Sequence, residues 1–203
     1  MGGPLGRVAL LLAGVLLIAG CGDASDPLVA SSPGSAATGA TESAAATGAT
    51  PRKPDVSPVQ LRIPAIQVST PLVGLGLHED GTVEVPTNPD RAGWYELGTV
   101  PGQPGSSVIL GHLDSLDGPA VFAELATLRV GQDVEVGLSD GTTVTFRIRR
   151  IATFANADFP ADLVYAGSRG QTTLNLVTCG GEYDPDLGGY QANVVVFTRR
   201  VAA

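Results

Sequence analysis

The sequence predicts an all-β domain, a closed or nearly closed barrel, over residues 59–203. Two observations support this prediction. Short segments rich in β-branched residues recur along this region, and turn signals made of Gly, Pro, Ser or Asp separate them. All ten aromatic residues lie between Trp94 and Phe197, so the hydrophobic core belongs to this part of the chain. A domain of this length can bury a self-sufficient core.

The expected strands are short, and turns separate them along the chain. The clearest hairpin signal is Ser139-Asp140-Gly141, because alternating β-branched segments flank it on both sides. A strong strand also runs into His112, directly after two Pro-Gly pairs. In chain order, the segments expected to form strands are 60–63, 71–73, 82–85, 106–112, 133–138, 142–154, 172–179 and 193–200.

One helix is expected, over Pro119–Leu128. Proline suits the first helical position, and Asp117 can cap the start of the helix. The apolar residues of the segment fall on one stripe at helical spacing. The predicted domain is therefore a barrel with one or two short helices.

The first 21 residues are typical of an export signal. Arg7 gives a positive start, and an apolar stretch of about twelve residues follows, short of the ~20 that span a membrane. The stretch ends Leu-Ile-Ala-Gly-Cys21, which resembles the lipobox of bacterial lipoproteins. That resemblance implies cleavage before Cys21 and lipidation of its thiol. The alternative is an uncleaved signal anchor, and either anchor leaves the rest of the chain on the extracytoplasmic face of the cell membrane.

Residues 22–58 are predicted to be a disordered linker. From Ser31 to Pro51 every residue except Glu42 is Ala, Ser, Thr, Gly or Pro. Such a segment cannot bury enough apolar surface to offset its chain entropy. A flexible linker of this length spans ~35 Å, so we expect a tether between the membrane and the domain.

Charge and composition exclude several classes of function. The net charge is −8 and no Lys/Arg patch stands out, which argues against nucleic-acid binding. The chain has two Cys and two His, without zinc spacing, so neither a metal nor another cofactor is expected. Three carboxylates, Glu182, Asp184 and Asp186, follow the second cysteine. Solvated loop residues explain them better than a calcium site does.

Cys179 is the best candidate for a nucleophile. It ends an apolar strand, and Gly180-Gly181 follows, which leaves the sulfur accessible at a strand rim. Attack on a carbonyl needs the thiolate, and a free thiol has a pKa near ~8.5, so Cys179 needs a basic partner. His112 also ends a strand, just before a loop, whereas His78 lies in a surface turn. The alternative is that Cys179 is a small core residue and His112 is structural.

Three segments resemble the motifs of sortases, most closely those of the actinobacterial class F. They are 107–115 (SVILGHLDS), 118–122 (GPAVF) and 176–181 (LVTCGG), and the resemblance runs in order from about Val59 to Phe197. It implies an eight-stranded β-barrel whose cysteine cleaves an LPxTG-like sorting signal on secreted proteins. The acyl product then passes to an amine of a peptidoglycan precursor. On this resemblance Cys179 is the nucleophile and His112 is the general acid and base.

The sequence departs from the family at one catalytic position. Sortases carry an Arg at the start of the last strand, in class F within Tyr-Arg-Asp-Asn, and the corresponding run here is Tyr190-Gln191-Ala192-Asn193. Gln191 is a candidate oxyanion donor, because an amide N–H can still donate, but it brings no positive charge. The arginines weighed as replacements are Arg62, Arg91, Arg169, Arg199 and Arg200.

Three functions therefore stay open from the residues. The first is a membrane-tethered cysteine transpeptidase. The second is a catalytically weakened sortase-fold lipoprotein that binds sorting-signal or cell-wall peptides. The third is a cysteine peptidase that uses water as the acceptor.

Overall fold

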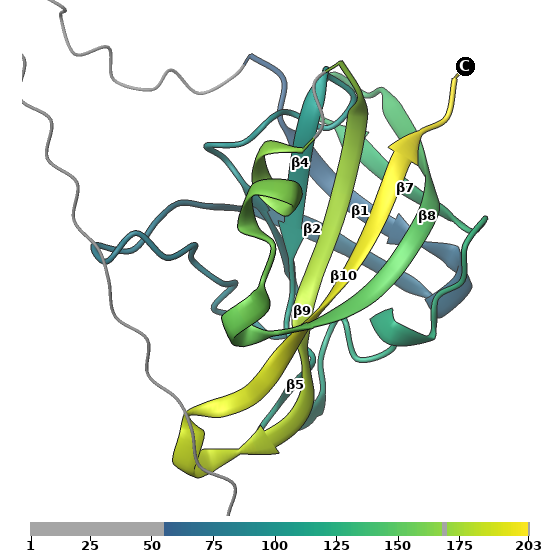
Figure 1. Ribbon diagram of the computed structural model, residues 1–203. Coiled ribbons are helices and arrows are strands. Elements are labelled where there is room, and N and C mark those ends of the chain that lie inside the picture. Colours follow the sequence, from purple (N-terminus) through teal and green to yellow (C-terminus); the bar gives the residue numbers. More distant parts are fainter. Residues whose placement is uncertain (1–54, 168–169, 203) are drawn as a thin grey trace, which may run out of the picture. The chain divides into compact units, whose positions relative to one another are not determined.

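Eight strands close into a barrel in the computed structural model, which describes residues 55–167 and 170–202 (Figure 1). The predicted signal segment with Cys21, and the linker up to residue 54, lie outside the described residues. The barrel starts at Pro58, one residue before the predicted boundary. Its strands are β1 (Pro58–Ile63), β2 (Val68–Leu75), β3 (Ala92–Tyr95), β4 (Gly105–Leu110), β7 (Asp133–Leu138), β8 (Thr143–Ala155), β9 (Thr172–Asp184) and β10 (Gly189–Arg200).

The strands run around the barrel in the order β1-β2-β3-β4-β9-β10-β8-β7, and β7 closes back onto β1. Two pairs are parallel, β2 with β3 and β4 with β9, and the others are antiparallel. The parallel pairing of β4 with β9 places Leu110 beside Val177. It thus joins two segments that are far apart in the sequence, and these are the segments that end in His112 and Cys179.

Smaller elements decorate the barrel. A separate two-stranded hairpin, β5 (Asp114–Ser115) with β6 (Gly118–Pro119), follows β4. The helical elements are single turns: η1 (Pro64–Ile66), η2 (Leu125–Thr127), η3 (Asn156–Asp158), η4 (Asp162–Ala166) and η5 (Pro185–Leu187). The all-β barrel predicted from the sequence is therefore confirmed. Within the described residues no helix is long and apolar enough to cross a bilayer.

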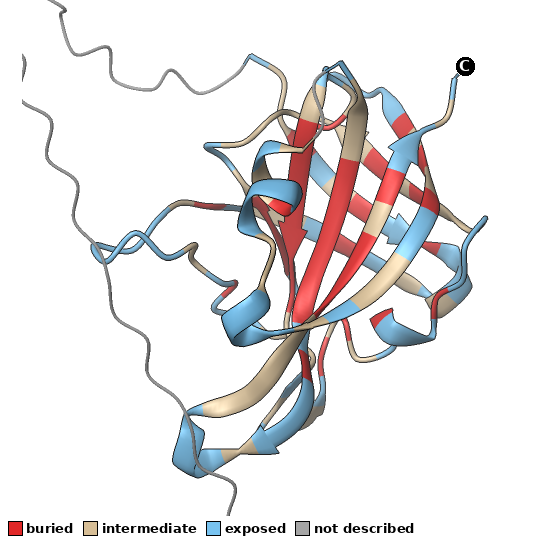
Figure 2. Ribbon diagram, in the orientation of Figure 1, coloured by how far each residue is buried: buried red, intermediate tan, exposed pale blue. Residues whose placement is uncertain are grey.

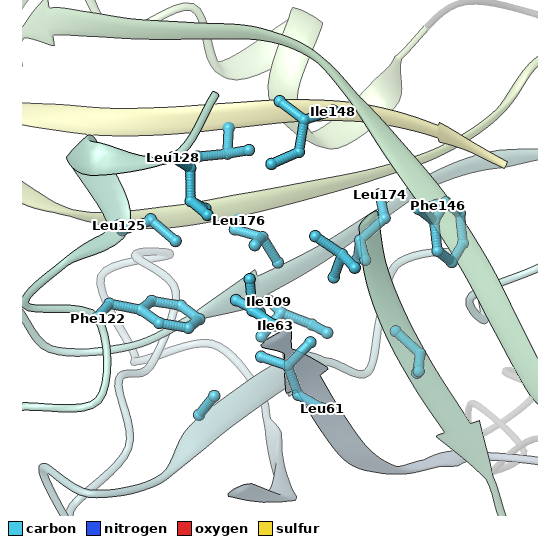
Figure 3. Packing of buried hydrophobic residues seen from close by; sticks show 14 of the residues in the cluster. Leu61, Ile63, Ile109, Phe122, Leu125, Leu128, Phe146, Ile148, Leu174 and Leu176 are labelled. Carbon is cyan, nitrogen blue, oxygen red and sulfur yellow. The ribbon is translucent and has the colours of Figure 1, made fainter. Parts of the chain in front are cut away.

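Apolar side chains fill the barrel interior (Figure 3). Alternate residues of each strand point inward, such as Ile109 on β4 and Leu174 and Leu176 on β9, and all three are fully buried. Phe122, Leu125 and Leu128 come from the loop between β6 and β7 and pack into the same cluster. This interior carries most of the hydrophobic stabilisation.

The helix predicted over Pro119–Leu128 is wrong. Pro119 pairs with Asp114 in the small hairpin, and the next backbone N–H groups donate to other loops, as Phe122 does to His112 O at 2.9 Å. The chain then makes three-residue turns, with Leu125 N bonded to Phe122 O. The buried positions 122, 125 and 128 recur every three residues, which is the period of a 3₁₀-helix and not of an α-helix.

The prediction for the region before β4 is also corrected. Ala92–Tyr95 forms β3, which the sequence did not reveal as a strand, while the segment 82–85 contributes only one bridge, between Val83 and Leu77. Gly93 hides the strand signal because glycine has low β-propensity. Its lack of a side chain has a packing reason, since a Cβ there would lie 2.5 Å from Leu75 Cγ.

A second apolar cluster covers the outer face of the sheet formed by β4, β9, β10 and β8. Val108, Leu110, Val177 and Val195 belong to it, and they alternate with residues of the interior cluster. The loop between β8 and β9 covers this face. Its members that pack there are Val164, Phe159 and Tyr165, and the Tyr165 ring meets Tyr95 edge-on at 5.4 Å.

A buried polar contact fixes this loop to the sheet. Asn175 Nδ2 donates to Val164 O at 2.7 Å and to Ser106 Oγ at 2.9 Å, and Ser106 Oγ donates to the same carbonyl at 2.7 Å. These groups are buried, so their mutual satisfaction specifies one position for the loop.

Candidate active site

Cys179 lies where β9 leaves the barrel wall. The residues Leu174–Thr178 are buried and Cys179 is the first exposed residue after them (Figure 2). Alternation along β9 puts Cys179 on the outer face, together with Asn175 and Val177. The sequence expectation of an accessible sulfur at a strand rim agrees with this position.

His112 lies at the matching place on the neighbouring strand. Leu110 pairs with Val177, and Gly111 N donates to Val177 O at 3.1 Å, which continues the parallel ladder by one step. His112 follows Leu110 by two residues, as Cys179 follows Val177, so one further step in the same register would set the two residues level. The topology therefore brings the two residues that the sequence singled out to the same edge of the sheet.

A backbone contact fixes the protonation pattern of His112. Its Nε2 atom lies 2.6 Å from the carbonyl oxygen of Pro86. A carbonyl oxygen only accepts, so Nε2 carries the proton of this bond. Nδ1 is then the ring nitrogen with a lone pair that can accept a proton.

The surroundings of Cys179 favour the neutral thiol. Partial burial raises the pKa of the Cys179 thiol, and the nearby carboxylate of Asp114 raises it further, while a backbone hydrogen bond acts in the opposite direction. The thiolate is therefore scarce at neutral pH, and its formation depends on proton transfer to a base.

Asp114 and Tyr190 form a pair next to the thiol that sequence reasoning did not single out. Tyr190 Oη donates to Asp114 Oδ2. This hydrogen bond raises the pKa of Tyr190 most strongly, with further contributions from burial and from the charges of Asp114, Cys179 and Tyr183. The only sequence signal was that each residue lies inside a motif already quoted, SVILGHLDS for Asp114 and YQAN for Tyr190.

Gln191 occupies a break in the strand pairing. Tyr190 pairs with Tyr183 and Ala192 with Gly180, so Gln191 faces two residues of β9, Gly181 and Glu182, which form a β-bulge. Its Nε2 donates to Gly189 O at 2.6 Å, which turns the amide toward the hairpin's own backbone. This bond uses one of the two amide N–H groups, so one donor remains for another acceptor.

The residue directly across from the nucleophile is Asn193, which pairs with Cys179. Asn193 Nδ2 donates to Asn156 Oδ1 at 2.9 Å, and Asn156 Nδ2 donates to Tyr190 O at 2.7 Å. These bonds link the end of β8 to the start of β10. They hold the part of β10 that contains Gln191 from the side opposite β9.

The two glycines after Cys179 allow β10 to approach closely. A Cβ on Gly180 would lie 2.8 Å from Val194 Cγ2, and one on Gly181 would lie 2.8 Å from Ala192 Cβ. Gly181 also has a φ of 77°, which strains any other residue. The glycines are thus required by backbone geometry as well as by access to the sulfur.

A hollow of about 460 Å³ adjoins the loop that holds His112. Pro86, His78, Glu84 and Arg91 are among its lining residues. His78 is exposed, as expected for a surface turn. Arg91 lines this hollow with Pro86, and Arg169 is outside the described residues. Arg62, Arg199 and Arg200 are exposed on β1 and at the end of β10.

The described part of the chain contains no group of three or more His, Cys, Asp or Glu side chains arranged to hold a metal ion. Glu182 and Asp186 are exposed, and Asp184 accepts the N–H groups of Asp186 and Leu187 at the start of η5. The carboxylate of Asp184 therefore has a structural role as a cap.

Residues 61–201 match the sequence model of the sortase domain. The chain belongs to the sortase family. The general class of this protein is therefore that of the sortase-type transpeptidases. A search of curated proteins finds no match to this sortase.

Solved structures of sortases share the fold of this sortase. Sortase C-1 from Actinomyces oris is 24% identical with a TM-score of 0.56, over 71% of this chain and 72% of that one. Sortase C1 from Streptococcus agalactiae is 24% identical with a TM-score of 0.55, over 71% and 67%. Sortase A from Corynebacterium diphtheriae is 17% identical with a TM-score of 0.56, over 75% and 63%. At these identities the likeness establishes the barrel.

Proposed function

We propose that this sortase is a cysteine transpeptidase of the class F type. It cleaves an LPxTG-like sorting signal near the C-terminus of secreted proteins and joins the acyl product to a cell-wall amine. The support for this proposal is the β4–β9 register, because continuing it beyond Leu110 and Val177 would set His112 level with the exposed Cys179. A thiol and an imidazole at one rim are what acyl transfer through a thioester needs.

The first half of the reaction forms the acyl-enzyme. His112 takes the Cys179 proton at Nδ1, because Nε2 is held by Pro86 O. The thiolate attacks the scissile carbonyl, and the remaining amide N–H of Gln191 donates to the oxyanion. His112 then protonates the leaving amine, and a thioester on Cys179 remains.

The second half passes the acyl group to an amine. His112, now neutral, takes a proton from the incoming nitrogen as the C–N bond forms. The electron pair of the C–S bond returns to Cys179. Water would give hydrolysis by the same path, so the acceptor decides between a transpeptidase and a peptidase.

The test uses the full-length protein in detergent with a library of LPxTG-type peptides. Intact mass should show an acyl adduct on Cys179, and added amine should give a product heavier by the amine. Cys179→Ala abolishes the adduct, and His112→Ala lowers turnover ~10²-fold or more. His78→Ala is the matched control and changes nothing. Undiminished adduct formation in Cys179→Ala would overturn the proposed mechanism.

A binding function is the second candidate, and the position of Gln191 favours it. The Gln191 amide is bonded to Gly189 O, and the site lacks the positive charge of the family arginine. A protein that binds the peptides without forming an adduct, but gains the adduct in Gln191→Arg, is a weakened sortase. A product that forms at the same rate without amine indicates a peptidase.

We also propose that the chain is anchored through a lipid on Cys21, with the predicted linker before β1 as the tether. The support is the sequence Leu17 to Cys21 at the end of an apolar stretch. Lipoprotein-type modification supplies several acyl chains, which anchor firmly where one alone binds marginally. Cys21→Ser should leave the precursor uncut. A wild-type membrane protein whose N-terminus is still Met1 would indicate a signal anchor instead.

A further inference from the structure

The small β5–β6 hairpin, which directly follows His112, brings Asp114 to the hairpin of β9 and β10. There the carboxylate accepts the hydroxyl of Tyr190. The Tyr190 ring in turn meets Tyr183 edge-on, with ring centroids 5.1 Å apart. Asp114 is exposed, and its charge acts on the Cys179 thiol. One exposed carboxylate is therefore held by a tyrosine at the side of the nucleophile.

The charge of Asp114 opposes the first half of the reaction. A negative group beside Cys179 destabilises the thiolate and so lowers the fraction that can attack a peptide. Neither Asp114 nor Tyr190 has a task in acylation as derived above. The pair therefore calls for a function at another step.

In the second half of the reaction the negative charge of Asp114 is favourable instead of unfavourable. After acylation the sulfur is part of a neutral thioester, so Asp114 no longer repels a thiolate. The incoming reactant is an aliphatic amine, which is protonated at neutral pH because such groups have pKa values near ~10. A carboxylate beside the thioester attracts this cation and forms a charge-assisted hydrogen bond with it.

We propose that Asp114, held in place by Tyr190, is the binding site for the protonated acceptor amine. The chemical class that it recognises is a primary aliphatic ammonium group, as on a lysine-like side chain. This inference rests on the proposed function, because it assigns the acceptor subsite of the same transfer reaction. The hydrogen bond from Tyr190 leaves the second carboxylate oxygen, Oδ1, for the ammonium group.

In the transfer step the bound ammonium loses one proton to water, and its nitrogen lone pair then attacks the thioester carbon. The C–N bond forms, the second proton goes to His112, and the C–S pair returns to Cys179 as the thiolate. The enzyme is left as thiolate and imidazolium, the pair that attacks the next peptide, in equilibrium with the neutral thiol and imidazole.

The experiment isolates this step from peptide recognition. The full-length protein in detergent is acylated by a small reagent, the benzyl thioester of N-acetylglycine, and peptide mapping separates the Cys179 adduct from any on Cys21. The decay of the adduct is followed by intact mass at pH 7.5 against two amines. Nα-acetyl-lysine amide is charged at this pH, and hydroxylamine is uncharged.

Asp114→Asn should lower the second-order rate with the lysine derivative by ~10-fold, the scale of losing one ionic partner. It should leave the rate with hydroxylamine unchanged. Added salt should slow the charged amine in the wild type and have no such effect in Asp114→Asn. Asp117→Asn is the matched control, because Asp117 is an exposed carboxylate in the same hairpin turn. Tyr190→Phe should show a smaller loss with the same selectivity for charge.

Equal slowing of both amines in Asp114→Asn would overturn the inference, since that pattern indicates a purely positioning role. An unchanged rate with the lysine derivative would also overturn it. The reagent does not depend on the sorting signal, so a wild type that fails with every peptide contradicts the proposed function and leaves this measurement intact. A Cys179 that the thioester cannot acylate would overturn both.

Discussion

Strands β9 and β10 each consist of two parts with opposite character. In the barrel, the segments Leu174–Thr178 and Val194–Val196 are buried and pair with β4 and β8 on their other edges. Beyond Gly180 the two strands continue as a two-stranded ribbon of exposed and half-buried residues, which extends past the barrel wall in Figures 1 and 2.

The difference shows how stability and chemistry are separated along one strand. Packing fixes the barrel part, because each inward side chain touches the core. Besides the strand pairing, side-chain hydrogen bonds hold this region in place. They join Tyr190 to Asp114, Gln191 to Gly189 and Asn193 to Asn156. Cys179 lies at the junction, so the packed barrel holds its backbone while its side chain is exposed.

The largest effects should come from one substitution on each side of this junction. Leu176→Ala removes a fully buried side chain and should lower the free energy of unfolding by ~2–5 kcal/mol. Cys179→Ala should change that free energy by less than about 0.5 kcal/mol and abolish acylation. Denaturant unfolding measures the free energy of unfolding, and the intact mass of the adduct measures acylation. A strong loss of stability in Cys179→Ala would contradict the separation.

Gln191 tests whether a side chain of the ribbon serves the chemistry without contributing to stability. If its amide donates to the oxyanion, Gln191→Ala should lower the acylation rate by ~10²–10³-fold while the unfolding curve is unchanged. Gln191→Arg should raise acylation, because the guanidinium brings the charge that the amide lacks. Equal acylation by the wild type and Gln191→Ala would remove Gln191 from the mechanism. Arg91→Ala would then be the next variant to measure.

Gly181 tests whether the ribbon depends on backbone geometry. Gly181→Ala places a Cβ 2.8 Å from Ala192 Cβ at a φ of 77°, so the bulge must shift. We expect acylation to fall ~10-fold or more, since a misplaced donor loses most of its effect. Gly141→Ala is the matched control, because Gly141 has a φ of 84° but no neighbour within 4 Å of its Cβ position. Equal acylation rates for the two variants would show that the contact does not matter.

The smallest expected effect concerns the pH dependence of the thiol. Burial and Asp114 both raise the pKa of Cys179, so the wild-type thiol should react slowly with iodoacetamide at pH 7.5 and faster as the pH rises. Asp114→Asn removes a negative neighbour, which stabilises the thiolate and moves the pKa down. Alkylation at pH 7.5 should then be a few-fold faster. A slower reaction would contradict the assigned sign.

The sequence predicted the barrel part better than the ribbon. Alternation around Ser139–Gly141 follows from burial of one face, and the apolar run within 172–179 follows from burial of both faces, so each leaves a trace in residue type. The hydrogen bond between Asp114 and Tyr190 leaves no such trace, because it joins two polar residues 76 positions apart. The bulge at Gln191 depends on pairing between strands, and the turns at 122–128 depend on acceptors in other loops. Those partners exist only in the folded chain.

The parallel pairing of β4 with β9 also bears on the order of folding. Residues 105–110 must pair with residues 172–177, which lie far along the chain, and such distant pairings make folding slow. His112 and Cys179 come together only through this pairing. Until the barrel has closed, the thiol has no base beside it, so an incompletely folded chain carries a cysteine without the means to activate it.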